Sequence, residues 1–330
     1  MIRSLKRSGL LLALLFVATR VGLAQDLDLV APESVGLSSD RLTHMDRVID
    51  RQIEEDLLAG AVVLLAREGE VAYLRAAGMQ DRAAEEPMQE ETIFRIASMT
   101  KPITSVAVMM LYEEGRFRLG DPVSDYIPAF ADMRVLADSA DASKPLEERA
   151  TVEAERPITI RHLLTHTSGL AYQWNPQLGE AYEEAGITHG LVGDEDPLSE
   201  DIPRLAEFPL LHQPGEAWTY GLSVDVLGYL VEQVSGRPFP EFLQERIFEP
   251  LGMDHTQFHL TEEEELLLSA AYTVGEDGGL RQLGDEIVEG SGTIYSAPYP
   301  TSDGHRYFSG GGGLTSTVPD YFRFAQMLLN

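Results

Sequence analysis

The sequence predicts an α/β (α+β) fold in which a helical part is inserted into a sheet domain. Three observations lead to this fold class. β-rich runs follow a helical pattern near the N-terminus, a long helical stretch fills the middle, and short apolar runs broken by glycine return after residue 270. Strands, helices and strands in that order indicate one sheet with an insertion. We place the sheet part at about 35–97 and 270–330 and the helical part at about 98–269.

The N-terminal part is expected to form a helix and a hairpin. Apolar residues recur at helical spacing over 41–58. The runs 61–66 and 71–74 are β-rich, and the Glu-Gly-Glu link at 68–70 favours a hairpin between them. Residues 92–96 then lead into the helical middle.

Four further helices are expected along the chain. Apolar periodicity begins at Ser98 and stops at Gly115, and similar patterns cover 158–164, 225–234 and 240–248. Residues 138–155, rich in Asp, Glu, Ala and Ser, are expected to form an exposed insertion.

A last helix is expected over 317–329, where a threonine cap precedes a proline in the first turn. This apolar helix stops at Asn330 with no strand or polar tail after it. We therefore expect the chain to end inside a domain, with the C-terminal strands missing. The alternative is a natural C-terminal helix packed on the sheet.

Residues 1–24 have the pattern of a secretory signal peptide. Arg3, Lys6 and Arg7 precede an apolar run over 9–19, and small residues stand before the expected cut after Ala24. The mature chain, 25–330, would then be periplasmic or secreted. An uncleaved N-terminal anchor is the alternative. No later stretch is long and apolar enough to predict a stable membrane span.

The composition excludes several classes of function. The chain holds no cysteine, which rules out cysteine nucleophiles and thiolate metal sites. Its 54 acidic against 25 basic residues give a formal net charge of −29, which disfavours nucleic acid and anionic membranes as partners.

One lysine stands out because the chain avoids this residue type. Only Lys6, Lys101 and Lys144 occur, and Lys6 lies in the expected leader. Lys101 follows Ser98 by three positions on the expected helix, so the two side chains share a face. Arginine stays protonated, whereas a buried lysine can lose its proton and act as a base toward an adjacent serine. The pair therefore predicts an activated serine nucleophile.

The residues around this pair form an ordered set of motifs. Segment 94–102 reads Phe-Arg-Ile-Ala-Ser-Met-Thr-Lys-Pro, and 119–123 reads Leu-Gly-Asp-Pro-Val, followed by Tyr-Ile-Pro. Segment 158–170 reads Ile-Thr-Ile-Arg-His-Leu-Leu-Thr-His-Thr-Ser-Gly-Leu, and 213–221 reads Gln-Pro-Gly-Glu-Ala-Trp-Thr-Tyr-Gly. Together they resemble the serine β-lactamase and penicillin-binding protein superfamily, especially its class C-like branch. The resemblance covers about residues 35–330.

The resemblance implies a β-lactamase/transpeptidase-like fold with an antiparallel sheet flanked by helices. It also implies that Ser98 is the nucleophile and that Lys101 and Tyr220 share the proton transfer. The expected function is an exported serine hydrolase that cleaves a small ester, amide or peptide, β-lactams included, through an acyl-serine. Neither a metal nor an organic cofactor is implied.

Two departures from the family pattern bear on the substrate and on the site. Leu222 stands where a Tyr-x-Asn element would place its asparagine, which favours an esterase or amidase over an efficient β-lactamase. Ser223 could substitute but is one position late. The family's third motif is not found after Tyr220, because 309–317 resembles the glycine-rich turn that precedes it. The missing strand would supply one oxyanion donor, the other being the N–H of Ser98.

Other candidate motifs favour structural roles. His162 and His166 have a spacing that can bind zinc, but Leu163 replaces the glutamate of His-Glu-x-x-His, so packing or local hydrogen bonding is expected. The glycines of 310–313 lack the Lys-Ser/Thr of a phosphate loop. A second class of function stays open, namely a protein that binds peptidoglycan or β-lactam ligands without turnover, or an inactive fragment.

Overall fold

The computed structural model describes residues 27–137, 144–191, 196–275, 278–284, 287–290, 293–296 and 305–330. The expected leader lies outside these ranges, so export stays a prediction. Within them, no helix combines the length and the apolar composition that crossing a bilayer requires.

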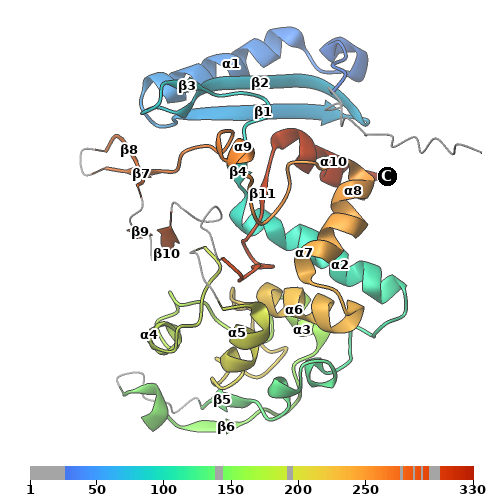
Figure 1. The fold of residues 1–330 in the computed structure, drawn as a ribbon, viewed down its shortest axis with the longest axis vertical. Helices are drawn as coiled ribbons and strands as arrows, with labels where there is room; N and C mark the ends of the chain where they lie inside the picture. Colours follow the sequence, from blue (N-terminus) through green and yellow to red (C-terminus); the bar gives the residue numbers. More distant parts are fainter. Residues whose placement is uncertain are drawn as a thin grey trace, which may run out of the picture.

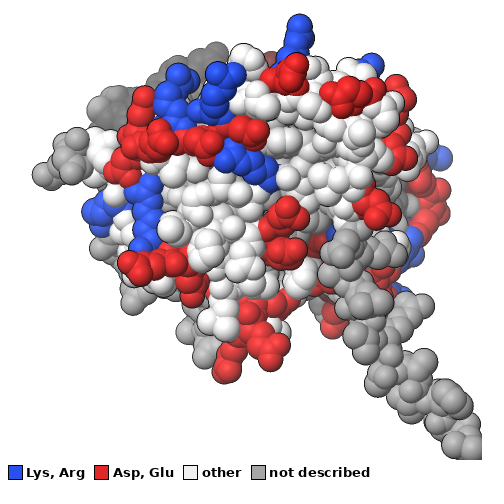
Figure 2. All heavy atoms as spheres, turned by 90° about the horizontal axis from the view of Figure 1, so that it is seen from above, with Lys and Arg blue, Asp and Glu red and all other residues white. Residues whose placement is uncertain are grey.

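The expected hairpin is present and forms a three-stranded antiparallel sheet. Strand β1 (Gly60–Arg67) pairs with β2 (Glu70–Asp81), and β2 pairs with the short β3 (Glu86–Pro87). Helix α1 (Ser39–Glu54) covers one face of this sheet and α10 (Val318–Leu329) lies on the other (Figure 1). Acidic side chains are spread among basic ones on the outer side of the molecule (Figure 2).

The strands after residue 270 are arranged differently from the expectation. Strands β7 (Tyr272–Val274) and β8 (Leu280–Gln282) pair with each other, as do β9 (Ile287–Gly290) and β10 (Thr293–Ser296). In the described ranges none of them pairs with β1–β3, although the N–H of Ala270 donates to the carbonyl of Gln80 (2.9 Å). These runs are too short and too often broken by glycine to extend the main sheet.

One C-terminal strand does join the N-terminal part of the chain. Strand β11 (Thr315–Ser316) pairs antiparallel with β4 (Phe94–Arg95), and the N–H of Ile96 donates to the carbonyl of Leu314 (3.1 Å). This pairing brings the glycine-rich segment before β11 next to the residues that follow β4.

The helical middle is built around α2 (Thr100–Glu113), which packs against α6 (Ser223–Ser235) (Figure 1). Ile103, Ala107 and Val108 on α2 are completely buried, in agreement with the predicted apolar face. Gly115 ends this helix as expected, with φ of +72°. Helices α3 (Ile160–Leu164) and α5 (Leu198–Leu205) pack on other sides of α6.

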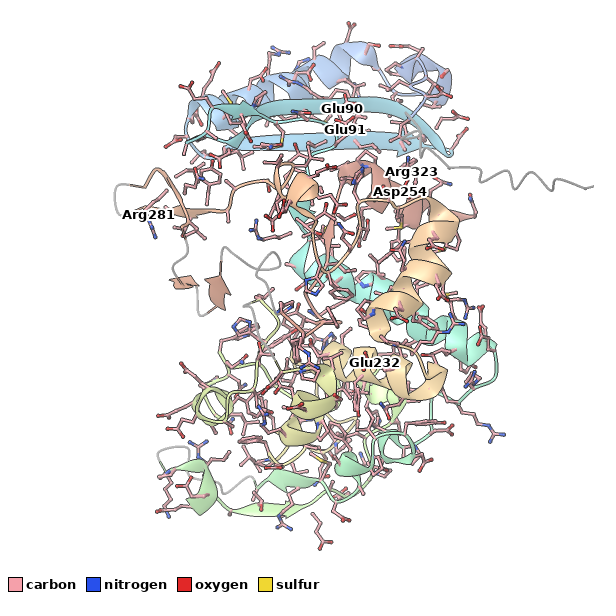
Figure 3. The ribbon with its side chains drawn as sticks, in the orientation of Figure 1. Glu90, Glu91, Glu232, Asp254, Arg281 and Arg323 are labelled. Atoms are coloured by element: carbon pink, nitrogen blue, oxygen red, sulfur yellow. The ribbon has the colours of Figure 1, made fainter. Side chains whose placement is uncertain are left out.

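The predicted helix at 240–248 is interrupted. It consists of α7 (Phe239–Leu243), the π-helical turn η6 (Gln244–Phe248) and α8 (Glu249–Leu251). Glu232 of α6 accepts the backbone N–H of Phe239 (2.9 Å) and so ties α6 to the start of α7 (Figure 3).

Short elements complete the helical part. Part of the expected insertion at 138–155 pairs as a strand, because β6 (Thr151–Glu153) runs antiparallel to β5 (Arg134–Leu136). Residues 138–143 of that expectation lie outside the described ranges. Two further short α-helices are α4 (Gly179–Glu184) and α9 (Glu262–Glu265).

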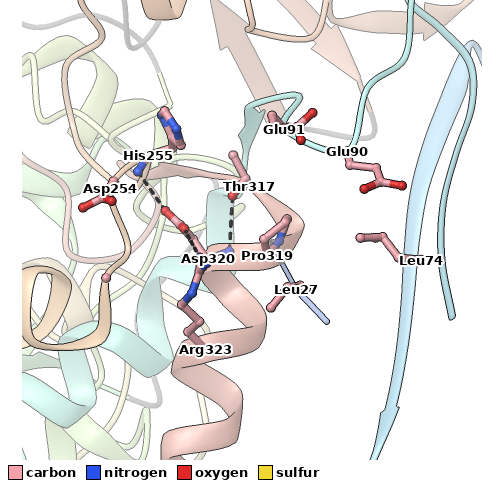
Figure 4. A pocket seen from close by; sticks show the side chains of 11 residues that line it. Leu27, Leu74, Glu90, Glu91, Asp254, His255, Thr317, Pro319, Asp320 and Arg323 are labelled. Carbon is pink, nitrogen blue, oxygen red and sulfur yellow. Dashed lines mark hydrogen bonds and ion pairs between the residues drawn. The ribbon is translucent and has the colours of Figure 1, made fainter. Parts of the chain in front are cut away.

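Helix α10 begins as the sequence predicts, and a buried carboxylate fixes its first turn. The hydroxyl of Thr317 accepts the N–H of Asp320 (3.2 Å). Asp320 accepts in turn from the N–H of His255 (2.8 Å) and the hydroxyl of Thr256 (3.0 Å), and it pairs with Arg323 (2.9 Å; Figure 4). Burial raises the pKa of Asp320, while these donors oppose the rise. The start of α10 is thus held against a loop of the helical part.

Candidate active site

Ser98 lies in a tight turn between β4 and α2. This turn, η2 (Ala97–Met99), precedes α2, which begins at Thr100 and not at Ser98 as the sequence predicted. Ala97 has φ of +42°, a left-handed conformation that is costly outside glycine and is often found at functional sites. The side chain of Ser98 is exposed, so a substrate can reach its hydroxyl.

The three residues predicted for catalysis meet in space. Tyr220 Oη lies 2.6 Å from Ser98 Oγ, and Lys101 Nζ lies 3.3 Å from the same oxygen. The amine of Lys101 also sits 4.6 Å from the centre of the Tyr220 ring. A hydroxyl, a phenol and an amine within proton-transfer distance form a nucleophile with two neighbouring proton acceptors. The geometry fits the predicted roles, which themselves stay predictions.

Two close backbone contacts fix the position of the loop that carries Tyr220. The N–H of Thr219 donates to the carbonyl of His166 (2.8 Å). At Gly221 a Cβ atom would lie only 2.3 Å from the carbonyl oxygen of Leu170, so this position requires glycine. These two contacts bring the phenol, 122 residues away in sequence, to the nucleophile.

The glycine loop (residues 309–313) is a part of the site that the sequence analysis did not assign. The carbonyl of Gly311 accepts from Lys101 Nζ (2.7 Å), and the carbonyl of Gly310 accepts from the hydroxyl of Thr104 (2.8 Å). Both donors lie on α2. The only indication in the sequence was the run of four consecutive glycines. Such a run indicates that the backbone closely approaches another part of the molecule, but it does not identify that part.

A buried carboxylate supports this loop from the other side. Asp225, in the first turn of α6, is fully buried and accepts a hydrogen bond from Ser309 Oγ (2.6 Å). Burial raises the pKa of Asp225, while the Ser309 hydrogen bond and the charge of Lys101 lower it. Asp225 lies five positions after Tyr220, but a single aspartate in an apolar helix carries no sequence signal of such a role.

Two neutral groups surround the phenol of Tyr220. The ring of His166 lies 5.2 Å from that of Tyr220, and burial, with the charge of Lys101, lowers the pKa of His166 to about 4. The ring of Tyr172 lies 5.3 Å from Tyr220 on another side, and burial, with the charge of Asp225, raises its pKa well above the usual range. At neutral pH, therefore, His166 is an uncharged imidazole and Tyr172 an uncharged phenol.

The position after Gly221 offers no polar group to a substrate. Leu222 is completely buried in the core, so its side chain does not face the site. Ser223, considered as a substitute for the absent asparagine, is also buried, and it hydrogen-bonds Ser168 (2.8 Å). Its role is therefore structural.

The two histidines at zinc-like spacing have separate local environments. His162 closes a capping box, in which its Nδ1 accepts the N–H of Thr159 (3.2 Å), while His166 faces Tyr220. Across the described part of the chain, no group of three or more histidine, aspartate or glutamate side chains could hold a metal ion.

Comparison with known proteins identifies the family. The family model named Beta-lactamase matches residues 45–330. The chain is 38% identical over 283 residues to esterase EstB of Burkholderia gladioli, covering 84% of this chain and 68% of EstB. It is 36% identical to protein Rv1367c of Mycobacterium tuberculosis, of which it spans 63%. It is also 32% identical to lovastatin esterase of Penicillium rubens, of which it spans 68%.

Solved structures support the same assignment. EstCE1, described as a hydrolase with promiscuous acyltransferase activity, matches with a TM-score of 0.76 at 32% identity over 87% of this chain and 72% of EstCE1. Simvastatin synthase (LovD) from Aspergillus terreus matches with a TM-score of 0.69 at 27% identity over 88% of this chain and 69% of LovD. The chain belongs to the beta-lactamase family of serine hydrolases, in the branch of EstB and LovD, and has the β-lactamase/transpeptidase-like fold expected from its motifs.

Proposed function

We propose that this protein hydrolyses small carboxylic esters through an acyl-serine intermediate. The observation that carries the proposal is the exposed hydroxyl of Ser98, which lies 2.6 Å from the phenol of Tyr220 and 3.3 Å from the amine of Lys101. The named activities of EstB, lovastatin esterase and EstCE1 support the same chemistry.

The first half of the proposed reaction is acylation. Ser98 Oγ attacks the ester carbonyl carbon while its proton passes to the pair formed by Tyr220 and Lys101, of which Tyr220 is nearer. The negative charge gathers on the former carbonyl oxygen, for which the N–H of Ser98 is the predicted donor. The carbon–oxygen bond to the alcohol then breaks, and the pair returns the proton to the leaving alkoxide.

The second half repeats these steps with water. The same pair takes a proton from a water molecule, whose oxygen attacks the acyl carbon, and then returns it to Ser98 Oγ as the acid leaves. Lys101 is held for both halves by the carbonyl of Gly311 (2.7 Å).

The residue at one position, Leu222, favours esters over β-lactams as substrates. The family's asparagine helps to hold a lactam side-chain amide, and here the corresponding Leu222 is buried and apolar. A second candidate function is acyl transfer to an alcohol in place of water. It is favoured by EstCE1 and by relatives named as acyltransferases, such as mokF of Monascus pilosus, 31% identical.

The proposal is tested by intact-mass spectrometry of the folded protein after mixing with p-nitrophenyl butyrate. We expect a transient mass increase equal to one butyryl group, together with release of p-nitrophenol. The adduct should be absent from Ser98→Ala and present in Ser105→Ala, a matched control because Ser105 lies on α2 and hydrogen-bonds the carbonyl of Lys101.

Two other results would contradict the proposal in different ways. A permanent adduct with no turnover would indicate a binding protein instead of an enzyme. The absence of both an adduct and p-nitrophenol release, on a chain shown to be folded, would exclude an esterase mechanism through Ser98 in these 330 residues.

A further inference from the structure

Four aromatic rings form a continuous surface beside Ser98, which we call the aromatic wall (Trp218, Tyr220, Tyr172 and Trp174). Trp218 is nearly parallel to Tyr220, with ring centres 6.0 Å apart and an angle of 15°. Tyr220 contacts Tyr172 (5.3 Å), and Tyr172 stacks on Trp174 (4.2 Å). The chain has only two tryptophans, and both belong to this wall.

The wall is buried in its middle, at Tyr172, and most open at its Trp218 end, while Trp174 at the other end is half-buried. Tyr172 is 3% exposed, whereas Trp218 is 66% exposed. An indole is one of the largest apolar surfaces that a side chain can offer, and most of this one remains in water. A single exposed apolar residue needs no explanation, but this one stacks on a ring whose oxygen is 2.6 Å from the nucleophile.

The position of Trp218 indicates which portion of a bound ester this side chain can contact. In the proposed reaction the pair of Tyr220 and Lys101 returns the proton to the leaving alcohol, so that oxygen must lie near Tyr220 Oη. The alcohol portion beyond this oxygen can then extend over the outer, exposed continuation of the same wall. That continuation is Trp218.

The amine of Lys101 restricts which chemical groups the aromatic wall can bind. Lys101 Nζ lies 4.6 Å from the centre of the Tyr220 ring and 5.6 Å from that of Tyr172. A cationic ligand would have to share these rings with an amine that already occupies them. A neutral, flat, apolar group meets no such competition.

We propose that Trp218 is a specificity residue that binds the alcohol portion of the ester and selects aromatic, uncharged alcohols. This inference rests on the proposed esterase function. Trp218 contacts the substrate before the alcohol leaves and makes no contact with the acyl-enzyme that remains. Its contribution therefore belongs to substrate binding and acylation, and hydrolysis of the acyl-enzyme is independent of it.

The test compares esters that carry an aromatic ring on the alcohol side, on the acyl side or not at all. 4-Nitrobenzyl butyrate and ethyl butyrate share the acyl group, while ethyl 4-nitrophenylacetate carries the ring on the acyl side. Each variant is compared with wild type on the same ester, so differences in leaving ability between the alcohols cancel. For Trp218→Ala we expect kcat/KM to fall about tenfold with the nitrobenzyl ester, mainly through KM, and to stay within about twofold with the other two. Trp218→Phe should retain most of the activity with the nitrobenzyl ester.

A control variant removes an aromatic side chain elsewhere. Tyr112 is 40% exposed near the far end of α2, and Tyr112→Ala should leave the ratio between the three esters unchanged. Equal losses on all three esters in Trp218→Ala would show that the residue only supports Tyr220, and unchanged values would show that it binds nothing. Either result overturns the inference.

A second measurement does not depend on turnover. In Ser98→Ala, 4-nitrobenzyl butyrate should quench the tryptophan emission in a saturable way. In the double variant Ser98→Ala with Trp218→Ala, the concentration that gives half-maximal quenching of the remaining Trp174 should rise about tenfold. An unchanged half-maximal concentration in the double variant would place the ring elsewhere and contradict the proposal. If wild-type protein forms no acyl adduct with any ester and releases no alcohol, the esterase proposal has failed, whereas the quenching still measures binding of the ring to the aromatic wall.

Discussion

Lys101 occupies a position that requires an amine. Its nitrogen lies between Ser98 Oγ (3.3 Å) and the carbonyl of Gly311 (2.7 Å), and it faces the ring of Tyr220. An arginine would place a larger planar group there and would remain protonated throughout a reaction cycle. In the proposed mechanism, this accounts for a lysine at this position in a chain that has only three lysines.

The first prediction at this scale compares two lysines. Lys101→Arg should lower kcat/KM for p-nitrophenyl butyrate by about 10²–10⁴-fold, because the base is lost, with the far-ultraviolet circular dichroism preserved. Lys144→Arg is the matched control, since Lys144 is exposed and its backbone carbonyl accepts a hydrogen bond from Arg149 (2.7 Å). Near-normal rates in Lys101→Arg would show that Tyr220 alone suffices as the base.

Asp225 can affect the geometry of the site without contacting a substrate. It is buried, it holds Ser309 (2.6 Å), and Ser309 begins the loop whose carbonyl holds Lys101. A carboxylate in such a place costs desolvation energy, which its hydrogen bond and the nearby amine offset. The geometry makes it a positioning residue.

At the scale of elements, the glycine loop is the part on which the site depends. It lies between α2, through Thr104 and Lys101, and α6, through Asp225. A Cβ at Gly311 would lie 2.5 Å from Asp225 Oδ2 and 3.0 Å from Tyr172 Oη, both of which belong to buried side chains. Close approach of the backbone to the side chains of Asp225 and Tyr172 requires glycine here.

A pair of alanine substitutions tests this view. Gly311→Ala should cost about 1–3 kcal/mol of unfolding free energy through overpacking and should lower kcat/KM by about 10–100-fold as the loop moves from Lys101. At Gly312 the new Cβ would lie close to the flexible end of Leu191 (3.0 Å) and at ordinary contact distance from Ser309 Oγ (3.9 Å), so Gly312→Ala should change both quantities far less. Urea denaturation and ester kinetics measure them, and equal effects in the two variants would refute the distinction.

At the scale of the whole molecule, the dominant property is acidity. The formal net charge is −29, and Figure 2 shows acidic groups spread over the viewed face with basic groups between them. Mutual repulsion among so many carboxylates opposes the compact state, and salt screens it.

The expected consequence is a salt-dependent melting temperature. At pH 7, Tm should rise by a few degrees between about 0.01 M and about 0.3 M NaCl, because the Debye length falls over this range. Near the sequence isoelectric point of about 4.5 the rise should disappear. Differential scanning calorimetry measures both, and an equal rise at the two pH values would indicate specific ion binding instead of screening.

The sequence by itself determined the family, and it predicted the nucleophile and its two partners, which the structure brings together. Ser98, Lys101 and Tyr220 lie in short ordered motifs, and a spacing of three residues, from the turn η2 to the start of α2, is enough to pair Ser98 with Lys101. The hairpin, α2 with its stop at Gly115 and the capped start of α10 were also predictable. Each of these depends on side-chain periodicity or on backbone preferences within a few neighbouring residues.

Only the tertiary structure decided which distant groups complete the site. The glycine loop reaches Lys101 through a contact between residues 210 positions apart, and Asp225 reaches Ser309 across 84 positions. Likewise the strands after residue 270 pair among themselves, and Trp218 stacks on Tyr220 at the open end of the aromatic wall. Backbone carbonyls, buried single carboxylates and ring stacking leave no periodic trace in a sequence, because they depend on packing between elements and not on local propensity.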